Sequence, residues 1–77
     1  MSFEDFKYLW ETQILPHKDK YIRKGQSLMI YLHKVWQEEY KRISAIEYYG
    51  ETNIDCFYND DLIPNTLKHL ETVWENI

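Results

Sequence analysis

Cysteine and histidine are the side chains in this sequence that most directly suggest catalysis or metal binding. The chain has one cysteine, Cys56, and three histidines, His17, His33 and His69. No pair among them has the compact spacing of a zinc site, and no local motif marks Cys56 as an activated nucleophile. A buried, unreactive thiol is the usual state of such a cysteine. We therefore expect no catalytic residue, no metal and no cofactor, and we expect that the protein is not an enzyme.

Acidic and aromatic residues surround the cysteine in the segment 54–61, which reads Ile-Asp-Cys-Phe-Tyr-Asn-Asp-Asp. The segment lacks the central glycine and the alternating ligands of a calcium-binding loop. We expect Asp60 or Asp61 to cap the turn into the last helix, where an acid also suits the helix dipole. The sequence therefore predicts a structural junction at Asp55, Phe57 and Asp60, with Phe57 anchored in the core.

A basic stretch at residues 23–27, Arg-Lys-Gly-Gln-Ser, opens a predicted helix. Backbone N–H groups at a helix start can hold an anion, and Gly25 leaves them unobstructed. The GxxxxGK[ST] pattern of a phosphate-binding P-loop is absent. Two alternatives follow. The stretch binds a phosphate, a nucleotide or an acidic protein loop, or it forms a basic turn whose Arg23 pairs internally with Asp55 or Asp60.

Tyr48 and Tyr49, which precede a predicted turn at Gly50, and Tyr58 in the segment 54–61 could supply contacts for such a site. Exposed tyrosines are common at protein interfaces and also stack on nucleobases. Tyr58 is expected to be a partly exposed contact, and the alternative for Tyr48 and Tyr49 is a half-buried position at the rim of the core. The predicted anion-binding or partner-binding residues are Arg23, Lys24, Gly25, Gln26, Tyr48, Tyr49 and Tyr58.

Apolar residues at helical spacing predict the elements that position these side chains. The first helix is expected from Phe3 to about Ile14, with Ser2 as its N-cap and Pro16 ending it. A second begins within residues 23–27. It runs to about residue 46 either unbroken or with a break near Gln37.

The last helix is expected from about Pro64 to Trp74, because proline is favoured in a first helical turn. Residues 54–58 have a strand-like composition without a partner strand, so we expect an extended segment packed on the helices. The sequence thus predicts an all-α fold of three to four short helices around an aromatic-rich core. Residues 1–77 are expected to form a single domain, with one tryptophan from each of three helices in the core.

Charge is distributed unevenly along the chain. Residues 1–46 carry eight basic and six acidic side chains, a balance of +2, whereas residues 47–77 carry one basic and seven acidic side chains, a balance of −6. The acidic half argues against binding to duplex nucleic acid, which needs a clustered basic face. No apolar run approaches the roughly 20 residues of a membrane span, and the opening residues lack a signal-peptide core. We therefore expect a cytoplasmic protein.

Two segments together resemble a group of short uncharacterised phage and bacterial proteins. Residues 23–29 match an R-x-G-Q-(A/S)-L-M helix opening, and residues 55–64 match a D-(C/P)-F-Y-x-D…I-P junction. The resemblance covers roughly residues 22–74, and relatives that often carry proline at the position of Gln37 favour the broken helix. It implies a small accessory protein in the host cytoplasm, but no catalytic residue.

The functional prediction is a non-enzymatic binding protein, a phage-borne inhibitor or modulator that binds a host or phage protein in host takeover or anti-defence. The alternative is a ligand-sequestering protein that binds a nucleotide or other phosphate-bearing anion at the start of the second helix. A homodimer that serves only a structural role is a third hypothesis.

Overall fold

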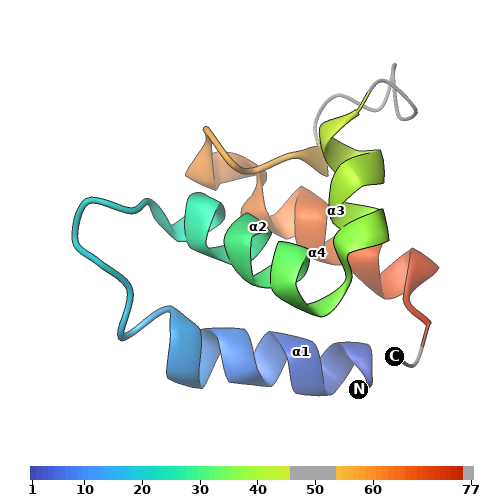
Figure 1. The fold of residues 1–77 in the computed structure, drawn as a ribbon, viewed down its shortest axis with the longest axis horizontal. Helices are drawn as coiled ribbons and strands as arrows, with labels where there is room; N and C mark the ends of the chain where they lie inside the picture. The colour runs from blue at the N-terminus through green and yellow to red at the C-terminus, as the bar shows by residue number, and fades with distance from the viewer. Residues whose placement is uncertain (46–53, 76–77) are drawn as a thin grey trace.

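The described part of the chain, residues 1–45 and 54–75 of the computed structural model, is all-α (Figure 1). Its elements in chain order are α1 (Phe3–Leu9), the π-helical segment η1 (Trp10–Ile14), α2 (Lys24–Val35), α3 (Gln37–Ser44), the 3-10 turn η4 (Asp60–Leu62) and α4 (Ile63–Val73). Helices α1 and α2 run in opposite directions across Figure 1, α3 turns away steeply from the end of α2, and α4 lies behind. The predicted all-α class is confirmed.

The first helix begins where the sequence predicts it. The Ser2 hydroxyl accepts the N–H of Asp5 at 3.1 Å, which satisfies one of the free donors of the first turn. The helix then widens, because the N–H of Leu15 donates to the carbonyl of Trp10, five residues back, at 2.8 Å. Pro16 follows directly, so the predicted span to Ile14 is confirmed with a wider final turn.

A break at Trp36 separates α2 from α3. Its backbone angles, φ −145° and ψ 78°, are not helical, so the chain changes direction there. This confirms the broken form of the second helix, with the break one residue before Gln37. The expected end of the broken-off helix, near residue 46, lies outside the described residues.

A cluster of aromatic side chains forms part of the core, as predicted. The indole of Trp74 contacts the rings of Phe3, Phe6 and Trp36 at centroid distances of 5.9, 4.9 and 5.3 Å. Phe6 also stacks on the ring of Tyr31. The fully or nearly buried apolar residues are Phe3, Phe6, Trp10, Leu28, Met29, Leu32, Ile43, Ile54, Cys56 and Leu70. The aromatic rings bury a large area per residue, which matters for a chain of this size.

The three tryptophans reach the core to different depths. Trp10 is buried and donates its indole N–H to the Ser27 hydroxyl at 3.1 Å, which joins η1 to α2. Trp36 and Trp74 are half-buried at the edge of the core. Both stand just past the end of a helix, as the C-terminal caps of α2 and α4.

The segment between α3 and α4 is irregular over residues 55–59. It packs against the helices, as expected, because Ile54 and Cys56 are buried and the Thr66 hydroxyl donates to the carbonyl of Ile54 at 2.6 Å. The N–H of Asn59 donates to the carbonyl of Cys56 at 3.2 Å and closes a turn. That turn carries the chain into η4 and α4, and it presents Phe57 and Tyr58 at its corner.

Candidate functional site

The start of α2 is closed by a carboxylate from the segment before α4. The backbone N–H of Gly25 donates to Oδ1 of Asp60 at 2.9 Å, and the Cys56 thiol donates to the carbonyl of Gly25 at 3.4 Å. The two segments approach so closely that a Cβ on residue 25 would collide with the carbonyl oxygen of Cys56. Glycine is therefore needed here for close approach.

Asp60 thus stabilises a different helix from the one the sequence suggests. We expected Asp60 or Asp61 to cap the turn into α4, and this prediction is wrong. The side chain of Asn59 performs that role, accepting the N–H of Asp61 at 3.0 Å. Asp60 reaches instead to the first turn of α2, where its negative charge meets the positive end of that helix dipole.

The guanidinium of Arg23 joins the same two segments by other contacts. Its Nη2 donates to the carbonyl of Phe57 at 3.2 Å, and the guanidinium carbon lies 5.7 Å from the centroid of the Tyr58 ring. The predicted ion pair of Arg23 with Asp55 or Asp60 does not form, since none of the salt bridges among residues 1–45 and 54–75 includes Arg23. Arg23 therefore joins the two segments through a carbonyl and an aromatic ring, not through an ion pair.

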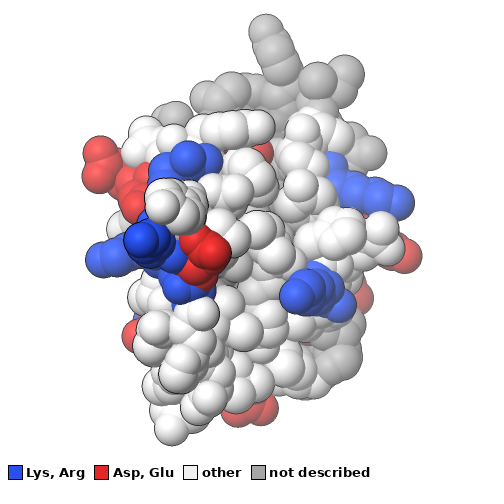
Figure 2. Space-filling view, turned by 60° about the vertical axis from the view of Figure 1, so that its left-hand side comes forward, with Lys and Arg blue, Asp and Glu red and all other residues white. Residues whose placement is uncertain are grey.

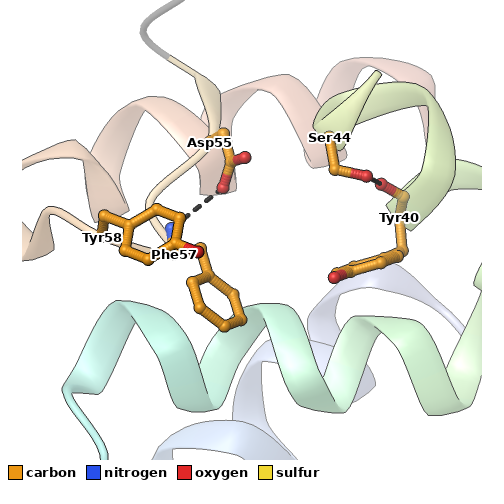
Figure 3. Close-up of a pocket in the computed structure, with 5 residues that line it drawn as sticks. All are labelled: Tyr40, Ser44, Asp55, Phe57 and Tyr58. Atoms are coloured by element: carbon orange, nitrogen blue, oxygen red, sulfur yellow. Dashed lines mark hydrogen bonds between the residues drawn. The ribbon is translucent and has the colours of Figure 1, made fainter.

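A hollow of about 250 Å³ opens beside this junction, and we call it the junction pocket (Figure 3). It is lined by Tyr40, Ser44, Asp55, Phe57 and Tyr58. The first two come from one face of α3, and the other three come from the irregular segment before η4. In Figure 3 the hydroxyl end of Tyr40 points across the opening toward Phe57, with Asp55 above both.

Hydrogen bonds hold the walls of the junction pocket in place. One oxygen of Asp55 accepts the N–H of Phe57 at 2.9 Å, and the Ser44 hydroxyl donates to the carbonyl of Tyr40 at 2.8 Å. Phe57 is half-buried against the core, as predicted, and its ring meets Tyr58 edge-on at 4.8 Å. Tyr58 is 80% exposed, so most of its ring is open to a partner.

Surface charge near the start of α2 is mixed. Figure 2 shows basic and acidic groups intermixed on one side of this face, beside a largely uncharged surface. The face is therefore no basic patch of the kind that binds duplex nucleic acid.

The structure brings together part of the predicted binding site. Arg23, Gly25 and Tyr58 meet the junction residues Asp55, Phe57 and Asp60. Lys24 is exposed on the first turn of α2, and the Gln26 side chain turns back to the N–H of Arg23 at 3.5 Å. Tyr48 and Tyr49 lie outside the described residues. Tyr40 and Ser44 were missed, although their spacing of four residues places both on one helix face.

Cys56 has the environment of a structural thiol. It is buried, and burial raises its pKa to about 11, with a smaller opposing effect of the hydrogen bond to Thr66. A thiol in this state supplies almost no thiolate near neutral pH, so Cys56 is poorly suited to nucleophilic catalysis. Within the two described ranges, no group of three or more His, Cys, Asp or Glu side chains could hold a metal ion.

One charged cluster was not anticipated from the sequence. Glu39 is 1% exposed, and its two carboxylate oxygens lie 2.8 Å from Nη1 of Arg42 and 2.9 Å from Nε2 of His69. The contact with His69 joins α3 to α4 across the edge of the core. A buried carboxylate needs such partners, because desolvation would otherwise strongly disfavour its charge.

Comparisons with known protein families, with curated proteins and with solved structures found no match for this chain. The resemblance to short phage and bacterial proteins therefore stays a prediction. In the ranges that the structure describes, no helix combines the length and the apolar character needed to cross a bilayer.

Proposed function

We propose that this protein acts by binding another protein through the surface around the junction pocket, and that it catalyses no reaction. The observation that carries the proposal is the exposed ring of Tyr58, placed between Arg23 and Phe57 at the edge of the hollow. Tyrosine and arginine are enriched among the residues that dominate binding energy at interfaces. Tyr58 lies in the turn closed by the hydrogen bond from the N–H of Asn59 to the carbonyl of Cys56, and the Arg23 side chain is held by its hydrogen bond to the carbonyl of Phe57. Little conformational entropy is therefore lost when a partner docks.

The proximity of Asp60 favours a protein partner over a phosphate-bearing ligand. The carboxylate already accepts the N–H of Gly25 in the first turn of α2. A phosphate that used this donor would have to displace the carboxylate and then lie beside its negative charge. A protein surface can instead contact Tyr58 and Arg23 without entering the first turn.

The partner that we propose is a host protein, bound in the host cytoplasm by a phage-borne inhibitor or modulator. The motif resemblance and the small size of the chain support this part of the proposal.

The test is a quantitative affinity capture with two matched tyrosine variants. Tyr58 and Tyr21 are 80% and 81% exposed, and each ring has one neighbouring cation, Arg23 or Lys20. Tyr58→Ser is expected to reduce enrichment of the specific partner from an extract of the producing cells at least about tenfold, as for a central interface residue. Tyr21→Ser is expected to leave enrichment unchanged.

Equal losses in the two variants, or no loss in either, would contradict this placement of the interface. Circular dichroism of both variants checks that the fold is intact. A separate titration of the protein with inorganic phosphate or a nucleotide tests the alternative, because a ligand site at the start of α2 would shift the amide resonances of residues 24–26.

A further inference from the structure

The junction pocket combines aromatic rings with a carboxylate, and this combination suits a cation. We propose that it receives the cationic end of a lysine or arginine side chain of the partner protein. The inference rests on the proposed function and names the chemistry of the partner at this site.

Aromatic rings supply the first part of the argument. Tyr40, Phe57 and Tyr58 come from two separate segments and line one opening (Figure 3). A cation within about 6 Å of a ring face is attracted to the negative side of the ring quadrupole, by roughly 0.5–2 kcal/mol depending on desolvation. The fold already uses this attraction, because the guanidinium of Arg23 lies 5.7 Å from the centroid of Tyr58.

The carboxylate of Asp55 supplies the second part. One of its oxygens accepts the N–H of Phe57, and in Figure 3 the other points toward the side of the opening where Tyr40 and Ser44 lie. The hydrogen bond fixes the orientation of the carboxylate, so an incoming ammonium or guanidinium meets a preorganised acceptor. A charge-assisted hydrogen bond of this kind is about twice as strong as a neutral one.

The negative charge of the surrounding segment also favours a cation. Residues 54–62 carry three aspartates and no lysine or arginine. Arg23 contributes a single positive charge at the outer edge of this segment, and the aspartates outweigh it. An anionic group of a partner would face Asp55 directly, whereas a cationic group is attracted both by the carboxylate and by the rings.

A titration of the full chain with small side-chain mimics tests the inference. The probes are Nα-acetyl-lysine methylamide and Nα-acetyl-norleucine methylamide, an uncharged analogue with the same four side-chain carbons and no ammonium group, with ¹H–¹⁵N resonances of the protein as readout. The lysine probe is expected to shift the amides of residues 40–44 and 55–58 with millimolar affinity. The norleucine probe is expected to bind at least about fivefold more weakly, because it lacks the charge.

Two aspartate variants provide the matched comparison. Asp55→Asn keeps an oxygen that can accept the N–H of Phe57 but removes the charge, and is expected to weaken the lysine probe about five- to tenfold. Asp61→Asn makes the same charge change at an exposed position of the next turn, and is expected to weaken the probe less than twofold. Equal weakening by both variants, or equal shifts with lysine and norleucine probes, would overturn the inference.

The outcomes separate this inference from the proposed function. If capture depends on Tyr58 while the lysine probe leaves residues 40–44 and 55–58 unshifted, the protein interface stands and the cation site is refuted. If the probe binds through Asp55 but capture is independent of Tyr58, the pocket takes a free ammonium compound rather than a partner side chain. In that case both the proposed interface and the partner named here are refuted.

Discussion

Substitution of Gly25 by alanine distinguishes the close approach at the start of α2 from ordinary helix propensity. Alanine usually stabilises a helix interior by about 0.5–1 kcal/mol relative to glycine. At this site, however, the new Cβ would collide with the carbonyl oxygen of Cys56 and would lie 3.2 Å from Oδ1 of Asp60. The carbonyl belongs to backbone, so it cannot move aside as the end of a flexible side chain could.

The expected cost follows from two contributions. Overpacking in a well-packed region costs about 1–3 kcal/mol. Separation of the two segments also weakens the hydrogen bond of the Gly25 N–H to the Asp60 carboxylate, a charge-assisted contact worth about 1.5–3 kcal/mol. After the favourable helix propensity is subtracted, Gly25→Ala is expected to lower the free energy of unfolding by about 2–4 kcal/mol. This corresponds to a fall in Tm of roughly 8–32 °C for a domain of this size.

Urea and thermal unfolding, followed by tryptophan fluorescence and circular dichroism, measure this effect. Lys24→Ala is the control, since Lys24 is exposed in the same helical turn and its removal is expected to change stability by less than about 0.5 kcal/mol. The double variant Gly25→Ala with Asp60→Asn should lose less than the sum of the single losses, because both disturb one contact. A Gly25→Ala protein as stable as the original would refute the reasoning.

Three further predictions concern two buried ionisable groups, Glu39 and Cys56. Glu39→Gln is expected to lower the free energy of unfolding by about 1–3 kcal/mol in urea titrations, because Arg42 and His69 lose a charged partner, and an unchanged midpoint would contradict the role of this cluster. Cys56 is expected to react with a thiol reagent at pH 8 about a hundredfold more slowly in the folded protein than after unfolding, because burial raises its pKa from 9.0 to about 11. The same difference predicts that Cys56 lowers stability as the pH rises above about 9, where the unfolded thiol ionises first. Rapid labelling of the native protein, or the same alkaline loss of stability in Cys56→Ala, would contradict this account of the thiol.

Local rules predicted most of the helical framework correctly. Ser2 caps α1 and Pro64 lies in the first turn of α4, because capping and proline geometry depend only on neighbouring residues. Apolar residues at helical spacing likewise predicted the helices themselves, since a periodic pattern reports which face of a helix is buried.

The contacts between distant segments could not be predicted in the same way. A local rule assigns Asp60 to its own helix, yet the fold places it against Gly25, 35 residues earlier. Glu39 occupies a Gln-Glu-Glu run that has the composition of an exposed helix face, yet it is buried and contacts His69, 30 residues further on. Both cases depend on which surfaces tertiary packing brings together, and a sequence pattern within one element does not predict these tertiary contacts.

Hydrogen exchange of the protein in its captured complex tests the central claim most directly. Amides are compared between the free protein and the complex, peptide by peptide. Our account predicts slower exchange in the complex at residues 54–60, which present Phe57 and Tyr58, and unchanged exchange at residues 17–22, which carry the equally exposed Tyr21. Protection at residues 17–22, with residues 54–60 unaffected, would contradict a binding surface at the junction pocket.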